Sequence, residues 1–556
     1  MANPIIQREL IGLLRTRRAF GLQLGLSLVL GILVLLRWPP DAQVNLTGDQ
    51  SQQVFQLFVF GLMVGLILLA PVFPASSIVR ERQQGTLALL LNSPLRPWDI
   101  LFGKLVGVLG YVLILLVLSL PAGAACWAMG GLSLGSQMFL AYGILTLAAV
   151  QYASAALFIS TRAANTDTSL RATYGVVLLM AVVVLGPFEF LGRLVTGPLG
   201  TTLEWIRCIS PIPAMLEILG QSAAGSSGIM SMEGAPFRYA VLAGISILIF
   251  NGLTLARLNL RMFDRPRNAG KITDERSTGA QVFRRIMYLW FFDPQRRSGL
   301  IGDSTNPVMI KEFRCSKFGR GHWMMRLIGG CLIVSLGLTL ASANSSTDWG
   351  VEKMGAILVL LQMALLILVT PSLASGLIST EREGGGWQLL QMTPLGAFTI
   401  IAGKLLAVWR TLLLLIMATL PGYALMVFYV DQDKAASALE IIFTLFLTAA
   451  FAILLSAAIS SLFRRTAVAT AVSYTLLLLI CAGTMLVWMG RGAPFTPPVV
   501  QAVLLVNPLA AALQAIRAPG FEEYNLIPQN WWILGGGCLL SLIVLIVQTR
   551  RLTRPR

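Results

Sequence analysis

The sequence predicts an all-α integral membrane protein with twelve transmembrane helices, arranged as two parallel six-helix repeats. Hydrophobic residues make up 56% of the 556-residue chain and charged residues only 12%. Apolar stretches of about 20 residues recur along it, which is the length that a helix needs to cross the hydrocarbon core. One polar motif also returns after 300 residues. Because strands would require short alternating runs in a closed barrel, spans this long and apolar are helices.

The predicted spans form two matching sets of six. They lie near 20–36, 54–79, 105–129, 138–160, 172–191 and 238–257, and near 324–341, 354–379, 405–430, 437–460, 467–490 and 531–548. Each set follows a basic, amphipathic segment, 3–20 or 306–323, which we expect to lie as an entry helix on the membrane surface. The chain therefore divides into a first transmembrane half at 1–257, a basic cytoplasmic linker at 258–305 and a second half at 306–556.

The repeat is clearest in two segments that each follow a second span. Residues 81–104 and 381–404 are identical at ten of 24 positions without a gap. Asn3-Pro4 likewise matches Asn306-Pro307 at an offset of 303. The residues shared by the two segments include Glu81, Arg82, Gly85, Pro94, Gly103 and Lys104 in the first copy and Glu381, Arg382, Gly385, Pro394, Gly403 and Lys404 in the second. The pattern indicates an internal duplication, which predicts two equivalent halves.

The distribution of charge predicts the orientation. If both termini are cytoplasmic, the cytoplasmic segments carry most of the 42 Lys and Arg residues, and the opposite loops carry more acids than bases. This asymmetry follows the positive-inside rule. The formal net charge of +17 is then explained by the membrane, so the high pI does not require a nucleic-acid partner.

A further apolar stretch follows the fifth span of each half. These stretches, 203–220 and 498–516, are interrupted by Pro211 and Pro213 or by Pro508. Counting both as spans would place the basic linker on the outer side, so we interpret them as outer re-entrant or interfacial hairpins. The alternative is one more buried helix in one half only.

The chain lacks the residues for most catalytic sites. His322 is the only histidine, and the six cysteines are scattered without close pairs. No glycine-rich phosphate loop is present, since Gly103-Lys104 and Gly403-Lys404 are followed by Leu and lack the required upstream glycine. We therefore expect no catalytic residue, no metal site and no cofactor bound by this chain, and we do not expect an enzyme.

The repeated segments 81–104 and 381–404 carry the strongest functional signal. Each is expected to form a short helix across the ends of two spans, with Leu89, Leu90, Leu389 and Leu390 as anchors and a proline as the stop. One such segment would be read as a well-packed turn. Two copies at matched topology favour a pair of docking surfaces.

These segments, with the entry helices and the outer hairpins, resemble the permease subunits of type-2 ATP-binding cassette transporters. The resemblance implies that 81–104 and 381–404 are cytoplasmic coupling helices, each seated on one of two separate ATP-binding cassette ATPase subunits that carry ATP-Mg. It implies docking roles for Glu81, Arg82, Glu381 and Arg382, within the motif residues named above, and secondary contacts by Arg162, Arg464 and Arg465. It also implies a role in the export, across a bacterial cytoplasmic membrane, of a substrate that the sequence does not identify.

Two other functions fit the hydropathy pattern. A secondary transporter of the major facilitator class also has twelve spans in two halves and a basic central linker. That class has a short, differently patterned turn where this chain has 24 residues. A non-transporting membrane scaffold is the third possibility, and only the first reading requires an associated ATPase.

Overall fold

The computed structural model describes eleven stretches of the chain: 4–14, 49–128, 137–163, 165–185, 198–219, 234–258, 306–315, 351–429, 435–489, 495–518 and 520–553, together with residues 21, 23, 25, 31, 329, 330 and 332. Within these stretches the chain is helical and contains no strand. Nine described helices are long and apolar enough to cross a membrane: Val54–Gln83, Pro97–Ala128, Phe139–Arg162, Ala235–Arg257, Leu358–Glu383, Ala397–Met417, Ser437–Leu462, Thr466–Trp488 and Gln529–Leu552. Each corresponds to a predicted span.

The other three predicted spans are described in part or not at all. The spans near 20–36 and 324–341 lie outside the described stretches, apart from isolated residues. The span near 172–191 is described through residue 185, as α8 (Thr166–Leu178) and the π-helical η2 (Leu179–Val183). The linker at 258–305 also lies almost wholly outside them, so the domain boundaries remain predictions.

The chain divides into two compact units. Unit 1 comprises Met1–Met262 and Tyr474–Asn507, and unit 2 comprises Phe263–Ser473 and Pro508–Arg556. Unit 1 therefore includes η6 (Leu479–Gly483), α22 (Thr484–Met489) and α23 (Pro497–Leu504) from the second half of the sequence.

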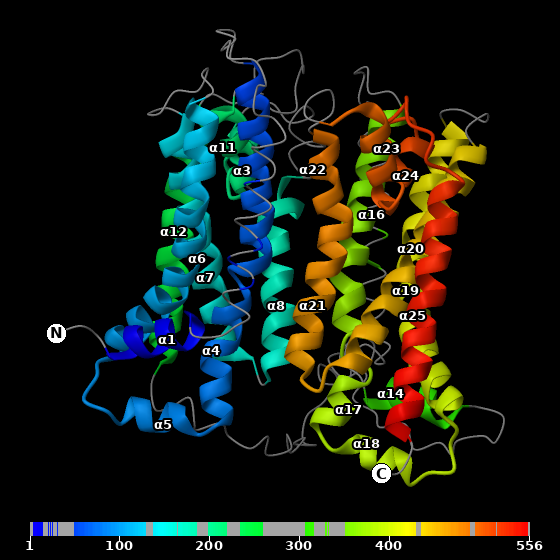
Figure 1. Ribbon diagram of the computed structural model, residues 1–556, viewed down its shortest axis with the longest axis horizontal. Coiled ribbons are helices and arrows are strands. Elements are labelled where there is room, and N and C mark those ends of the chain that lie inside the picture. Colours follow the sequence, from blue (N-terminus) through cyan, green and yellow to red (C-terminus); the bar gives the residue numbers. More distant parts are fainter. Residues whose placement is uncertain are drawn as a thin grey trace, which may run out of the picture. The chain divides into compact units, whose positions relative to one another are not determined.

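Unit 1 is built around α7 (Phe139–Arg162), which packs mainly on four other helices (Figure 1). These are α4 (Val72–Gln83), α6 (Pro97–Ala128), α8 and α12 (Ala235–Arg257). The buried positions of α7 include Ala148, Ala149, Ala153 and Ala156. Small residues allow helix backbones to approach closely, which is how helices associate in an apolar medium. The alanine-rich sequence of α7 thus explains its central place.

Two further contacts complete unit 1. The entry helix α1 (Pro4–Leu14) packs on α6, and α3 (Asp49–Leu69) packs on α6, α7 and α22. Tyr174 of α8 stacks on Tyr474, with ring centroids 4.7 Å apart, and its hydroxyl donates to the carbonyl of Leu68 at 2.8 Å. Tyr174 and Tyr474 occupy equivalent positions of the repeat, 300 residues apart.

Unit 2 repeats this arrangement with α20 (Ala435–Leu462) in the place of α7. Helix α20 contacts α16 (Val351–Ala374), α19 (Ala397–Tyr429), α24 (Pro508–Ala515) and α25 (Gln529–Thr553). The second entry helix, α14 (Pro307–Cys315), packs on α19 as α1 packs on α6. The duplication predicted from sequence is therefore a duplication of helix packing.

The predicted outer hairpins are each two short helices. The first consists of α10 (Pro198–Arg207) and α11 (Pro211–Ile218), and the second of α23 and α24. At a rise of about 1.5 Å per residue, helices of 8 or 10 residues are too short to cross a hydrocarbon core of about 30 Å. Neither stretch forms one straight span.

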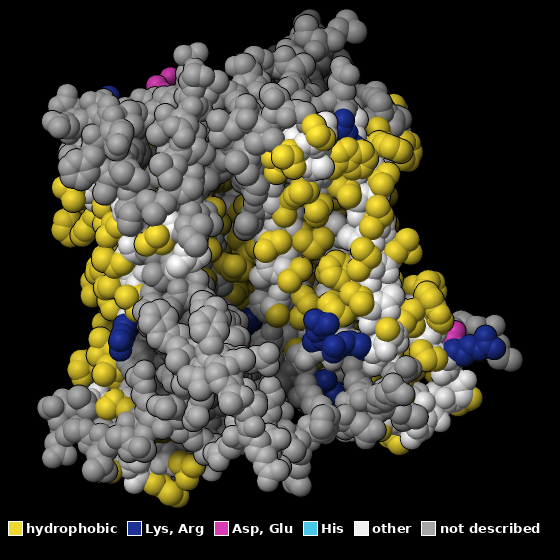
Figure 2. Space-filling model, turned by 180° about the vertical axis from the view of Figure 1, so that it is seen from behind, with side chains coloured by type: hydrophobic (Ala, Val, Ile, Leu, Met, Phe, Trp, Pro, Cys, Tyr) yellow, Lys and Arg dark blue, Asp and Glu magenta, His cyan; other side chains and the backbone are white. Residues whose placement is uncertain are grey.

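The described surface is strongly apolar. The exposed side chains of α12 include Phe237, Ile245, Leu248 and Leu253. Figure 2 shows that hydrophobic side chains cover much of the described surface on the side it views, with few Lys and Arg side chains among them. Such a surface would be insoluble in water and suits contact with lipid.

Candidate functional site

Each repeated segment, 81–104 or 381–404, folds as an elbow between two long helices. In the first elbow α4 ends at Gln83, α5 (Thr86–Leu91) follows, and α6 begins at Pro97. In the second, α17 (Ser379–Glu383) and α18 (Gly386–Gln391) precede α19. The coupling helix implied by the resemblance is therefore a six-residue helix set off by turns.

A glycine and a proline set the shape of each elbow. Gly85 and Gly385 have φ angles of 76° and 74°, in the left-handed region that side chains with a Cβ disfavour. The helix is therefore broken at the same point in both copies, although Gly384-Gly385-Gly386-Trp387 replaces Gln84-Gly85-Thr86-Leu87 in the second. Pro94 and Pro394 lie in the turn after the short helix, as predicted.

The short helices bury one face and expose the other. Leu87 and Trp387 are buried and Leu90 and Leu390 face the same side, whereas Leu89 and Leu389 are 73% and 69% exposed. The prediction that Leu89 and Leu389 anchor the elbow was wrong. With 3.6 residues per turn, the residues at positions 87, 90 and 91 share a face that position 89 does not.

Four charged residues form an ion-paired cluster behind the first elbow. The Lys104 ammonium lies 2.9 Å from a Glu81 carboxylate oxygen and 3.4 Å from a Glu9 carboxylate oxygen. It also donates to the Ser77 hydroxyl at 3.0 Å. Arg8 pairs with both Glu9 and Glu81. We call Arg8, Glu9, Glu81 and Lys104 the first junction, because they connect α1, α4 and α6.

The second elbow has the equivalent cluster. Lys404 pairs with Glu312 and, at 3.4 Å, with Glu381, while Lys311 pairs with Glu381 at 2.7 Å. Lys311 and Glu312 correspond to Arg8 and Glu9 at the offset of 303 that relates the two entry helices. Lys311, Glu312, Glu381 and Lys404 form the second junction, which connects α14, α17 and α19.

Each junction buries its lysine, Lys104 or Lys404, whereas the entry-helix cation, Arg8 or Lys311, is about half exposed. Lys104 is 1% exposed and Glu81 8% exposed. Burying a charge is unfavourable unless it is paired and hydrogen-bonded, and Lys104 meets that condition through two carboxylates and a hydroxyl. Partial burial lowers the pKa of Arg8, but hydrogen bonds to Glu9 and Glu81 and their charges raise it, with a net increase.

The arginine of each Glu-Arg pair caps a neighbouring helix. The Arg82 guanidinium donates to the carbonyls of Thr161, at 3.4 Å, and Ala163, at the end of α7. The Arg382 guanidinium donates to the carbonyls of Ser461 and Phe463 at the end of α20, at 2.8 and 3.4 Å. A cation is favourable there because the last carbonyls of a helix lack partners and carry partial negative charge. Glu-Arg thus connects each elbow to three other helices.

Two glycines, Gly107 of α6 and Gly403 of α19, lie where an entry helix comes close to the following span. Gly103 and Gly403 are buried, and a Cβ added to Gly403 would lie 2.7 Å from the Asn306 side-chain oxygen. A Cβ added to Gly107 would lie 2.6 Å from the Cβ atom of Glu9. These positions therefore have no room for a larger residue.

The three predicted secondary contact residues lie apart from the junctions. Arg162 is exposed at the end of α7, with its guanidinium 4.8 Å from the centroid of the Phe158 ring. Arg464 and Arg465 are exposed in the turn before α21 (Thr466–Leu478). None of the three takes part in a junction.

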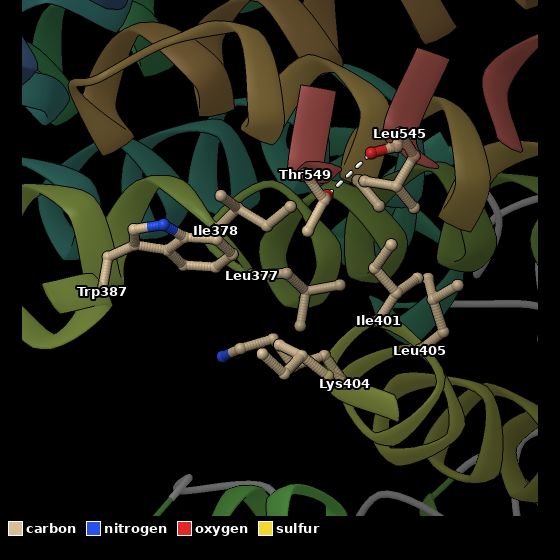
Figure 3. A pocket seen from close by; sticks show the side chains of 10 residues that line it. Leu377, Ile378, Trp387, Ile401, Lys404, Leu405, Leu545 and Thr549 are labelled. Atoms are coloured by element: carbon tan, nitrogen blue, oxygen red, sulfur yellow. Dashed lines mark hydrogen bonds between the residues drawn. The ribbon is translucent and has the colours of Figure 1, made fainter. Parts of the chain in front are cut away.

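A small apolar pocket lies behind the second elbow. Figure 3 shows the side chains that line it, with Lys404 and Trp387 near one edge and Leu545 and Thr549 across from them. Ala457 also lines it, and the equivalent residue of the first half is Leu157, a fully buried core residue. The smaller side chain leaves space that the first half fills.

Sequence reasoning missed the entry-helix members of the junctions and two serines. The Ser160 hydroxyl accepts hydrogen bonds from the backbone N–H groups of Ile78 and Val79, both at 3.1 Å. The Ser460 hydroxyl accepts them from Ile378 and Ser379, both at 3.0 Å. Asn3-Pro4 and Asn306-Pro307 differ by 303 residues, and the same offset aligns Arg8-Glu9 with Lys311-Glu312. This alignment would have identified the entry-helix members of both junctions. Within the described stretches, no group of three or more potential ligands could hold a metal ion.

Two regions of the chain match family models. Residues 13–265 match one model and residues 337–547 match a second, and both models are described as "ABC-2 family transporter protein". The matches stand in tandem, cover most of the chain and each contain one elbow. Both are membrane domains rather than ATPase domains. A comparison with curated proteins finds no match.

Proposed function

The chain belongs to the ABC-2 family of transporter proteins, as two permease domains in tandem, and from this premise we propose that it forms the whole membrane pathway of an ATP-driven exporter. A permease of this family works with an ATPase partner. In the proposal two ATPase subunits bind ATP-Mg, one seated at each elbow. Family membership sets aside the major facilitator alternative.

The observation that carries the proposal is the duplicated junction. Each junction connects an elbow to its entry helix and to the next long helix, and Arg82 or Arg382 adds the end of α7 or α20. A force applied to the short helix would therefore move four helices together rather than bend one loop. This is the property that a transmission element needs.

The same geometry assigns different roles to the buried and the exposed residues of each elbow. Glu81, Lys104, Glu381 and Lys404 are engaged within the chain, so in our proposal they hold the elbow rather than contact the ATPase. The contact falls to the exposed outer face of the short helices, at Leu89 and Leu389, and to the 84%-exposed Met392, which directly follows the second short helix. Gly85 and Gly385 present that face by breaking the helix.

The charge asymmetry supports the orientation in the proposal. Both elbows and both termini would face the cytoplasm of a bacterial cell, and the hairpins would face outward. The protein would then lie in the bacterial cytoplasmic membrane, in contact with its lipid, and bind no nucleotide itself. Its substrate class stays open.

Co-purification of the ATPase tests the proposal. We expect Leu89→Gln with Leu389→Gln to lower the amount of ATPase recovered with the full chain about tenfold, because an apolar contact at the centre of an interface is lost. Leu199→Gln, at a leucine of α10 that is also exposed, is the matched control and should leave recovery unchanged. Recovery of no ATPase with the unaltered chain would refute the partner, and normal recovery with the double variant would refute the docking face.

A further inference from the structure

The fifth span of each half contains a π-helical turn at the same place in the repeat. These turns are η2 and η6, and their bounds, Leu179–Val183 and Leu479–Gly483, differ by 300 residues. In the first, the Val184 N–H donates to the Leu179 carbonyl at 3.0 Å, the i to i+5 bond that defines such a turn. A π-turn is rare and less favourable than an α-turn, so its recurrence needs a cause.

A side chain from the hairpin that follows is hydrogen-bonded to each π-turn. The Ser210 hydroxyl donates to the carbonyl of Ala181 in η2 at 2.6 Å. The Asn507 amide nitrogen donates to the carbonyl of Cys481 in η6 at 2.9 Å. Ala181 and Cys481 are the third residues of their π-turns. Both donors are fully buried, and within an apolar medium a carbonyl without such a partner is strongly disfavoured.

Ser210 and Asn507 are placed for this role by the hairpin itself. Each directly precedes the proline that opens the second short helix, Pro211 of α11 or Pro508 of α24. Ser and Asn are preferred at the N-cap, and Pro is preferred at the first helical position. The Ser210 hydroxyl also accepts the Ile212 N–H at 3.2 Å, so it links the start of α11 to η2.

The C-terminal ends of α11 and α24 are hydrogen-bonded to the chain where the last span of each half begins. The Glu217 carboxylate accepts the backbone N–H groups of Gly234 and Ala235 at 2.9 and 2.7 Å, where α12 begins. Gln514 lies six residues after Pro508, as Glu217 lies six residues after Pro211. Its side-chain oxygen accepts hydrogen bonds from the backbone N–H groups of Leu526 and Ile527, both at 3.3 Å, shortly before α25. Each second hairpin helix is therefore anchored at both ends.

From this geometry we infer that Ser210 and Asn507 are positioning residues for transport, which hold the fifth spans in the π-helical form until the hairpin withdraws. A π-turn contains one more residue per turn than an α-turn, so its conversion rotates everything that follows by about 100°. The residues after each turn would then change their orientation in the pathway. This inference rests on the proposed function, because ATP binding by the ATPase subunits seated at the elbows supplies the motion.

Amide hydrogen exchange in the full complex, reconstituted with its ATPase in lipid nanodiscs, tests the inference. We compare peptides covering residues 179–184 and 479–484 in the nucleotide-free and vanadate-trapped states. Conversion must open the bond from Val184 to Leu179 before a bond to Met180 replaces it, and withdrawal of the hairpin removes the side chain that holds the turn. More frequent opening should therefore make exchange in at least one turn about tenfold faster in the trapped complex. Ser210→Ala with Asn507→Leu should remove this difference by releasing both turns in the nucleotide-free state.

The controls separate positioning from general packing. Ser210→Asn with Asn507→Ser exchanges the two donors between the halves and should preserve the difference. Ser246→Ala removes a hydroxyl of α12 that bonds Gln151 instead, and should also preserve it. If the complex hydrolyses ATP and is then trapped by vanadate, but exchange at both turns is equal in the two states, the inference fails while the proposed function stands. Failure of the unaltered chain to bind an ATPase refutes both.

Discussion

At the residue scale, the junction lysines explain why Gly-Lys recurs in both elbows. Lys104 is almost fully buried, and Glu9, Glu81 and Ser77 surround its ammonium group. In the second half Leu377 replaces Ser77, and Lys404 keeps only the carboxylate partners. The carboxylates, rather than the hydroxyl, are common to both junctions.

Removing one charge of a junction should therefore cost more than removing two. We expect Lys104→Met to lower the free energy of unfolding by about 3 kcal/mol, because the buried Glu81 carboxylate then loses one of its two cationic partners. Adding Glu81→Gln should recover at least half of that loss. Unfolding of the purified chain in mixed micelles measures both.

Arg465→Met is the control for this pair of variants, because Arg465 is exposed and outside the junction. It should change the free energy of unfolding by less than about 0.5 kcal/mol. Equal losses for Lys104→Met and Arg465→Met would mean that the junction contributes nothing to stability.

At the element scale, the two elbows share a backbone and differ in the packing beneath it. Leu87 and Leu157 are fully buried behind the first short helix. Trp387 and Ala457 occupy these positions in the second half, and the Trp387 indole N–H donates to the Leu552 carbonyl at the end of α25 at 3.2 Å. The second elbow is thus fastened to the last span by a hydrogen bond and leaves the pocket of Figure 3 beside it.

Filling that pocket should stabilise the second half. We expect Ala457→Leu to raise the free energy of unfolding by about 1 kcal/mol, as cavity-filling substitutions commonly do. The reciprocal Leu157→Ala should lower it by about 2–5 kcal/mol. Thermal unfolding in detergent reports both signs, and a lower midpoint for Ala457→Leu would show that Trp387 already occupies the space.

At the scale of the whole molecule, the compact units do not coincide with the sequence halves. Unit 1 takes residues 474–507 from the second half, including Tyr474, which stacks on Tyr174, and α22, which packs on α3. Gly61 of α3 lies close to α22, because a Cβ added to it would be 4.0 Å from the Leu486 side chain. The first half alone would therefore expose buried aromatic and aliphatic side chains.

Separating the halves should reveal this dependence. We expect a chain ending at residue 265 to be cleaved at least about tenfold faster by protease than the same residues in the full protein, because the surface that covers Tyr174 and α3 is missing. Co-expression of residues 266–556 as a second chain should restore the resistance. A first half that is equally resistant by itself would contradict the prediction.

The sequence alone determined the elements and their repetition. Apolar length requires helices in a membrane, so all nine described spans were predicted from hydropathy. Proline acts locally on the backbone, so the stops at Pro94 and Pro394 were predicted, whereas the break at Gly85 was found only in the structure. The 24-residue match located both elbows, and the family matches confirmed the resemblance drawn from it.

Only the tertiary structure decided which side chains meet. Glu9 is 72 residues from Glu81 and 95 from Lys104, and no local rule relates them. A charged residue near a membrane surface has the same hydropathy whether it faces water or a buried partner, so the sequence could not show that Glu81 and Lys104 turn inward or that Leu89 turns outward. The bond from Ser210 to Ala181 depends in the same way on how a hairpin folds back on an earlier helix. Pairing across such distances is set by packing, because the contacts form only once the helices are side by side.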